Sequence, residues 1–163
     1  MPPPTLGPAF HQLLQGRHIA TLGTKNADGS IHLTAVWSLF EDGHLFFATN
    51  SKSRKARNLT ARANASLMVD TRNQGTERGV TATGTATIIY ADASRQLNHH
   101  IHSRYLSAPA MSDPQVGPVF AAIDDVTLKI TPASWFTWDM AALDGQVFVG
   151  KLGKSSGYLL PLD

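Results

Sequence analysis

A cluster of cations at the start of a predicted helix is the part of the sequence best suited to chemistry. Lys52, Arg54 and Lys55 stand close together in the segment KSRK, directly after a polar turn. Exposed cations at a helix N-terminus oppose the helix dipole and cost roughly 0.3–1 kcal/mol each. Free backbone N–H groups, the hydroxyls of Ser51 and Ser53 and these cations favour an anion, most naturally a phosphate. A solvated basic helix face and a nucleic-acid patch remain alternatives.

Two apolar runs flank this cluster and predict the strands that position it. Residues 45–48 (LFFA) precede the turn, and residues 66–69 (SLMV) follow the predicted helix. Within the helix, Ala56, Leu59 and Ala63 recur at helical spacing, so one face can pack on a sheet. The cations therefore stand at a strand-to-helix junction.

The composition is that of an ordinary globular protein, with 163 residues, 42% of them hydrophobic and 16% charged. This length predicts a single domain over residues 1–163. A net charge of +2 gives no support to nucleic-acid binding. The absence of cysteine excludes disulfides, thiolate metal sites and cysteine nucleophiles. Without a signal peptide or a membrane-spanning apolar run, we expect a cytoplasmic protein that does not contact a membrane.

The periodicity along the chain predicts a mainly β fold with short peripheral helices. The segments that predict strands are residues 18–24, 31–40, 44–48, 65–71, 79–90 and 126–130, with a possible last short strand at 146–150. The segments outside them predict helices at 8–16, after residue 51 and at 92–106, a proline-broken loop at 108–118 and one helical turn at 119–123. Hairpin turns without a βαβ rhythm favour a six-stranded antiparallel barrel with helices outside. Gly84 marks a bulge or a close backbone approach.

Other constellations give weaker signals. His99 and His102 would share one helix face while His100 points elsewhere, and no acidic third ligand is near in sequence. We therefore interpret them as histidines of a polar helix face and assign no metal site. No nucleophile elbow and no GxGxxG pattern occur, so hydrolase, Rossmann and P-loop interpretations have no support.

Several segments together resemble the pyridoxamine 5'-phosphate oxidase-like superfamily. They are Asp28-Gly29, HLTAVWSLF, FFATNSKSRKARNL, NASLMVD and Gly84. The resemblance covers residues 17–132, with a flexible N-terminus at 1–7 and a C-terminal extension at 133–163. It implies a split β-barrel that binds FMN or a deazaflavin, and a homodimer with the cofactor at the subunit interface.

The resemblance also implies a set of cofactor-binding residues. Arg54 and Lys55 match the family's phosphate ligands, and Thr34 stands where an arginine of the second strand also reaches the phosphate. Arg57, one helical turn from Arg54, could compensate for that missing charge. The predicted cofactor-binding residues are Thr34, Val36, Trp37, Ala48, Thr49, Ser53, Arg54, Lys55 and Arg57. No catalytic residue is assigned.

The expected function is that of an FMN-dependent oxidoreductase acting on a small-molecule substrate, since no side chain here is redox-active. Leu39 stands where the oxidase's substrate-binding lysine would be, and the C-terminal basic signature is absent, so we do not expect pyridoxamine phosphate oxidation itself. One alternative is a reductase that uses the 8-hydroxy-5-deazaflavin coenzyme, with Lys52 or Arg78 serving its longer anionic tail. Another is a non-catalytic flavin- or haem-binding stress protein. Trp135 and Trp138 would cover a flavin or belong to an interface or core.

Overall fold

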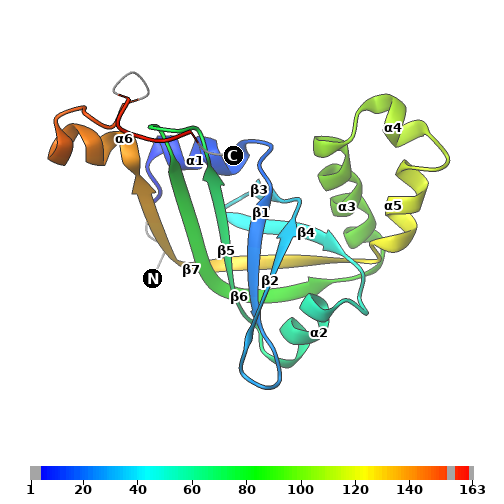
Figure 1. The fold of residues 1–163 in the computed structure, drawn as a ribbon. Helices are drawn as coiled ribbons and strands as arrows, with labels where there is room; N and C mark the ends of the chain where they lie inside the picture. The colour runs from blue at the N-terminus through cyan, green and yellow to red at the C-terminus, as the bar shows by residue number, and fades with distance from the viewer. Residues whose placement is uncertain (1–4, 154–156, 162–163) are drawn as a thin grey trace.

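The fold is a curled antiparallel sheet with helices packed outside it, seen here in a computed structural model that describes residues 5–153 and 157–161 (Figure 1). The sheet has seven strands in the order β2-β1-β5-β6-β7-β4-β3. The strands are β1 (Ala20–Lys25), β2 (Ile31–Val36), β3 (Leu39–Glu41), β4 (His44–Thr49), β5 (Asn64–Thr71), β6 (Arg78–Ile89) and β7 (Val126–Asp139). The mainly β split barrel predicted from the sequence is confirmed.

The seventh strand arises because the predicted strand 31–40 is interrupted at Trp37 and Ser38. Its first part, β2, pairs with β1, and its second part, β3, pairs with β4. The Tyr105 hydroxyl accepts a hydrogen bond from the Ser38 amide at 3.2 Å and donates one to the His18 carbonyl at 2.9 Å. The kinked segment therefore joins β2 and β3, which are the two edge strands of the sheet. This short connection between its edges curls the sheet into a half-barrel.

The sheet interior holds one hydrophobic core. Strands alternate between buried and more exposed positions, and α1 (Pro8–Gln15) places Leu13 and Leu14 over the core, as predicted. Each fully buried leucine contributes roughly 1.5–3 kcal/mol relative to exposure. At Gly84 a Cβ atom would lie 2.1 Å from the Thr131 carbonyl oxygen, and the β6–β7 register shifts there. The expected close backbone approach at Gly84 is confirmed.

The remaining helices lie outside the sheet. They are α2 (Arg54–Ala61), α3 (Ala91–Tyr105), α4 (Ala108–Ser112), α5 (Gly117–Ile123), α6 (Met140–Leu143) and a π-helical turn, η1 (Asp144–Phe148). Figure 1 shows α3, α4 and α5 together at one end of the barrel and α6 at the opposite side. No helix in the described part of the chain is long and apolar enough to cross a membrane.

Three sequence predictions need correction. Residues 108–112 form α4 instead of a loop, because the Ser107 hydroxyl accepts a hydrogen bond from the Ala110 amide and Pro109 fits the first turn. Residues 144–148 form η1, so a strand at 146–150 is wrong. The sixth predicted strand continues to Asp139 because β6 is long enough to pair with it throughout. Of the N-terminus predicted to be flexible, residues 1–4 lie outside the described residues.

Candidate functional site

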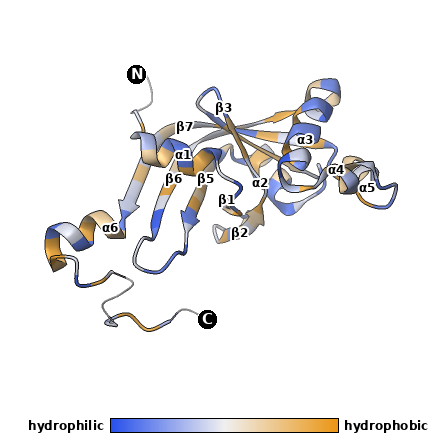
Figure 2. Ribbon diagram, turned by 90° about the horizontal axis from the view of Figure 1, so that it is seen from above, coloured by the Kyte–Doolittle hydropathy of each residue, from blue (hydrophilic) through white to orange (hydrophobic). Residues whose placement is uncertain are grey.

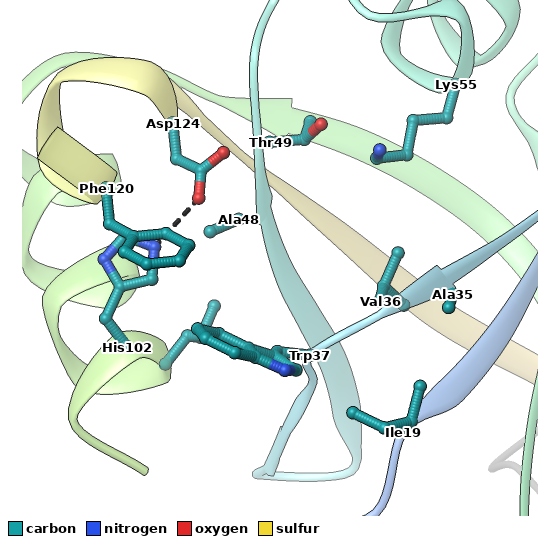
Figure 3. A pocket seen from close by; sticks show the side chains of 11 residues that line it. Ile19, Ala35, Val36, Trp37, Ala48, Thr49, Lys55, His102, Phe120 and Asp124 are labelled. Carbon is teal, nitrogen blue, oxygen red and sulfur yellow. Dashed lines mark hydrogen bonds and ion pairs between the residues drawn. The ribbon is translucent and has the colours of Figure 1, made fainter. Parts of the chain in front are cut away.

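A pocket of about 240 Å³ lies beside the kink between β2 and β3; we call it the Lys55 pocket (Figure 3). The barrel side contributes residues from β2, the kink, β4 and α2, and the opposite side is formed by α3, α5 and the residue after α5. Its lining residues are Ile19, Ala35, Val36, Trp37, Ala48, Thr49, Lys55, Ile101, His102, Phe120 and Asp124. Most of this wall is apolar. The Lys55 ammonium lies on one side of the pocket and the Asp124 carboxylate on the other (Figure 3).

Aromatic packing fixes one end of the pocket. The Trp37 indole stacks on the Tyr105 ring with centroids 5.0 Å apart and on the Phe120 ring at 5.2 Å. The kink frees Trp37 from the strand ladder, so its side chain can reach α3 and α5. These contacts occupy much of the indole, and Trp37 therefore serves the pocket as a fixed wall that joins the barrel to the helices.

Lys55 supplies the positive charge of the pocket. It is the second residue of α2, a helix whose N-terminus is capped by the Ser53 hydroxyl, which accepts a hydrogen bond from the Ala56 amide at 3.3 Å. Burial lowers the pKa of Lys55, and the negative charge of Asp124 acts in the opposite direction. Lys55 forms no hydrogen bond or ion pair within the described residues. Its ammonium group points into the pocket (Figure 3).

Five of the nine predicted cofactor-binding residues meet in this pocket: Val36, Trp37, Ala48, Thr49 and Lys55. The other four do not line it. Arg54 and Arg57 are exposed on α2, and the Ser53 hydroxyl is used as the helix cap. Within the part of the chain that the structure describes, the Thr34 hydroxyl makes one long contact, 3.4 Å, to the Ala35 carbonyl. A phosphate role for these four residues stays a prediction.

The hydroxyl of Ser51, which we expected to hold an anion, is already occupied. Asp125 accepts hydrogen bonds from the Ser51 amide and from the Ser51 hydroxyl, each at 2.6 Å. Asn50 also donates from its side chain to the Ile123 carbonyl at 2.8 Å. The loop before α2 is therefore tied to the end of α5, and a carboxylate of the protein itself takes part of the anion-binding capacity.

The sequence missed the helical side of the pocket, above all His102 and Asp124. His102 Nε2 lies 2.8 Å from Asp124 Oδ2, and only 2% of the His102 side chain is exposed. The prediction of a polar helix face is therefore wrong for His102, whereas His99 and His100 are exposed. A spacing of four residues between Ser94, Asn98 and His102 could have signalled a buried polar stripe, since residues four apart share a helix face.

That polar stripe holds α3 against the beginning of β7. The Asn98 side-chain amide donates to the Asp124 carbonyl at 2.8 Å, and Thr127 donates to Asn98 Oδ1 at 2.6 Å. The Ser94 hydroxyl lies 3.0 Å from that of Thr127. Satisfied buried networks of this kind rigidify their surroundings, so the position of Asp124 is well determined. Within the described residues, no three His, Cys, Asp or Glu side chains gather in a metal-binding group.

Comparison with protein-family models identifies the fold family. The model of the pyridoxamine 5'-phosphate oxidase family matches residues 6–139, which include the sheet, α2 and the whole Lys55 pocket. The chain belongs to this family. A search of curated protein sequences found no match.

Several solved structures share this architecture. A conserved hypothetical protein of Mycobacterium tuberculosis, Rv2991, superposes with a TM-score of 0.71 at 26% identity, over 85% of this chain and 88% of that one. An F420 reductase gives a TM-score of 0.63 at 20% identity over 80% and 98% of the two chains. General Stress Protein 26 of Bacillus anthracis gives 0.56 at 22% identity over 78% and 89%. The last two likenesses concern the fold alone.

Proposed function

We propose that the protein is an FMN-dependent oxidoreductase of this family that acts on a small-molecule substrate. The observation that carries the proposal is the half-buried ammonium of Lys55, which has no partner among the described residues and lies in a mostly apolar pocket. A partly buried cation without a partner is costly, so a site that keeps one is suited to an anion. The phosphate of FMN supplies such an anion, and the apolar wall suits its ring.

The residues present fit this cofactor. Lys55, at the N-terminal turn of α2, would hold the phosphate, with Arg54 and Arg57 at the exposed rim of the same helix. Val36 and Ala48 would contact the ring from β2 and β4. FMN, when bound, supplies the electron-transfer chemistry that no side chain here can supply. The protein would bind the cofactor, orient it and limit the access of water.

We further propose that the protein is a homodimer through the outer face of the sheet, the β2–β7 face. Antiparallel pairing aligns one row of residues across it: Ala35, Thr21, Met68, Thr81 and Phe136. The next row is Leu33, Gly23, Ser66, Thr83 and Ser134. Apart from Met68, the centre of the face is small or polar, and it forms a groove of about 570 Å³.

Large apolar side chains stand at the two edges of this face. Ile31 and Leu33 on β2 are 63% and 65% exposed, and Phe136 on β7 is 67% exposed; Figure 2 shows the hydrophobic colouring on β2. A two-fold axis that lies in this face, parallel to its strands, would set the centre of one copy against the centre of the other and the β2 edge of one copy against the β7 edge of the other. It would also bring Phe136 of one copy to Ala35 of the other, at the rim of the Lys55 pocket.

The 8-hydroxy-5-deazaflavin coenzyme is the second candidate. Lys52, Arg54 and Arg57 are exposed beside the pocket, where a longer anionic tail would meet them. The F420 reductase with the same fold supports this choice, and the alternative of a stress protein is in keeping with the fold shared with General Stress Protein 26. The three possibilities share the pocket and differ in the ligand and in turnover.

Absorbance of the purified protein and titrations with FMN and the deazaflavin coenzyme test the proposal. We expect saturable binding of one of the two, and loss of binding in the double variant Arg54→Ala, Lys55→Ala with the fold retained by circular dichroism. A protein that binds neither compound, or a double variant that binds as tightly as the wild type, would contradict the assigned site. Turnover with a hydride donor then separates an enzyme from a binding protein.

A further inference from the structure

The His102–Asp124 pair separates the Lys55 pocket from a second cavity of about 320 Å³, which we call the α3–α5 cavity. The α3–α5 cavity is lined by Arg95, Asn98, His99, His102, Met111, Gly117, Pro118, Ala121 and Asp124. His102 and Asp124 are the two residues that line both spaces. Arg95 and His99 are exposed, so the cavity reaches the protein surface.

The two ends of the pair face different spaces. His102 Nε2 is engaged with Asp124 Oδ2, and the other ring nitrogen, Nδ1, has no hydrogen-bond partner among the described residues. Figure 3 shows Nδ1 pointing away from the Lys55 pocket, while the second carboxylate oxygen of Asp124 is turned toward the Thr49 side of it. The pair therefore lies between the two spaces, with His102 Nδ1 at one end and the second carboxylate oxygen of Asp124 at the other.

We propose that His102 and Asp124 form an acid–base pair that takes up a proton from the α3–α5 cavity when negative charge develops on a ligand in the Lys55 pocket. The proton comes from water in the cavity and binds Nδ1, which gives an imidazolium whose Nε2–H remains on Asp124. The bond that forms is Nδ1–H, the bond that breaks is an O–H of hydronium in the cavity, which is left as water, and the pair moves no electron. Loss of the ligand's charge releases the proton by the same route.

The chemistry of the surroundings supports this assignment. Imidazole is the side chain that gains and loses a proton near neutral pH. A carboxylate hydrogen-bonded to it stabilises the imidazolium, and the new positive charge offsets that carboxylate for an anionic ligand nearby. The charged and titratable groups that face the pair are Lys55 from α2 and Arg95 and His99 from α3. The contacts from α4, α5 and β4 are uncharged: Met111, Gly117, Pro118, Phe120, Ala121, Ala48 and Thr49.

This inference deepens the proposed function, because bound FMN is the ligand whose charge changes. The first test measures how many protons the FMN-loaded protein takes up on reduction, from the pH dependence of its midpoint potential. We expect the FMN-loaded His102→Gln variant to lose up to one proton of uptake per FMN. The matched control is His99→Gln, which lines the same cavity from one helical turn away without touching Asp124. Equal uptake in wild type and His102→Gln, or an equal loss in His99→Gln, would overturn the inference.

A second measurement stands apart from cofactor binding. In free protein with ¹⁵N-labelled histidine, the Nδ1 signal of His102 should report proton binding on addition of acid, and Asp124→Asn should change that response. An imidazole that stays in one protonation state throughout would overturn the acid–base pair. A wild-type protein that binds neither FMN nor the deazaflavin would instead refute the proposed function, and the histidine titration would still decide whether the pair takes up a proton.

Discussion

Asp125 closes over the loop before α2, where its two carboxylate oxygens accept hydrogen bonds from the amide and the hydroxyl of Ser51, each at 2.6 Å. Asp124, its neighbour, faces the Lys55 pocket and bonds His102. Two adjacent acidic residues thus contact two different elements, Asp125 the loop before α2 and Asp124 the helix α3. The segment after α5 therefore connects the proposed phosphate-binding helix to the helices on the other side of the pocket.

Replacing Asp125 should weaken the protein in a pH-dependent way. The hydrogen bond from the Ser51 hydroxyl, followed by that from its amide, lowers the pKa of Asp125 below the ordinary value of 3.8. A lowered folded-state pKa contributes stability above the unfolded-state value, and that contribution is lost as the pH falls through the folded-state pKa. Because Asp125 is exposed, we expect Asp125→Asn to cost less than about 1 kcal/mol at pH 7.

Thermal unfolding at several pH values checks this prediction. The melting temperatures of Asp125→Asn and wild type should differ at neutral pH and converge as the pH falls below 3.8 and through the lowered pKa of Asp125, since both side chains are then uncharged. The control is Glu41→Gln, which replaces an exposed carboxylate on β3. The difference between its melting temperature and that of the wild type should not depend on pH in this way. A constant difference at all pH values would mean that the carboxylate charge contributes nothing.

Single substitutions on α2 should show which of the two predicted phosphate ligands, Arg54 or Lys55, contributes more to FMN binding. Lys55 lines the pocket, whereas Arg54 is exposed and does not. A lost charge-assisted hydrogen bond costs roughly 1.5–3 kcal/mol, so Lys55→Met should raise the Kd for FMN about 10- to 150-fold. Arg54→Met should raise it less than about fivefold, because an exposed ion pair is worth roughly 1 kcal/mol at most.

Fluorescence titration with FMN measures both values. Lys52→Met, an exposed cation just before the helix, serves as the control and should bind like the wild type. A larger effect for Arg54 than for Lys55 would show that the phosphate binds at the outer surface of α2 and not in the pocket.

Local patterns predicted much of this fold because the forces involved act over a few residues. The turn at Asp42-Gly43 has positive φ angles at both residues, as the hairpin signal requires, and Ala56 and Leu59 are buried at helical spacing as expected. The kink at Trp37 could not be predicted in this way. It depends on the hydroxyl of Tyr105, which is 67 residues away from Ser38 in sequence.

The same distinction applies to the site. The barrel side of the pocket follows a continuous motif, and its Lys55 could be placed from the sequence. Asp124 and Phe120 reach the pocket only through the packing of α3 and α5, and their sequence neighbourhood carries no signal of that contact. His102 was considered from the sequence as a metal ligand. Its contact with Asp124 could not be predicted, because Asp124 follows α5, a different element from the helix that carries His102.

A small substitution at Gly84 should test the bend in the longest strand pair. An added Cβ would lie 2.1 Å from the Thr131 carbonyl oxygen and 2.8 Å from the Pro132 Cα, both of them backbone atoms. Overpacking of this kind costs about 1–3 kcal/mol, so Gly84→Ala should lower the free energy of unfolding by that amount. Urea denaturation followed by tryptophan fluorescence measures it.

Gly145→Ala is the matched control for Gly84→Ala, since nothing lies within 4 Å of its added Cβ. It should leave the free energy of unfolding within about 0.5 kcal/mol of wild type. A Gly84→Ala variant as stable as this control would show that β6 and β7 can separate at the bulge without cost.

A charge on the outer face of the sheet should dissociate the proposed dimer. Leu33 is 65% exposed on β2, beside the groove formed by Gly23 and Ser66. In a two-fold dimer through this face, Leu33→Asp would bury an unpaired carboxylate in each copy, at a cost of several kcal/mol. The protein should then sediment as a monomer at micromolar concentration, whereas the wild type should sediment as a dimer.

The same variant should also lose FMN affinity, because the partner would no longer bring Phe136 to the rim of the pocket. Phe136→Ala separates the two effects: it should keep the dimer and raise the Kd for FMN severalfold. Val119→Asp, exposed on α5 and away from the β2–β7 face, is the control for added charge and should change neither property. A wild-type protein that binds FMN as a monomer would show that the second copy contributes nothing to the pocket.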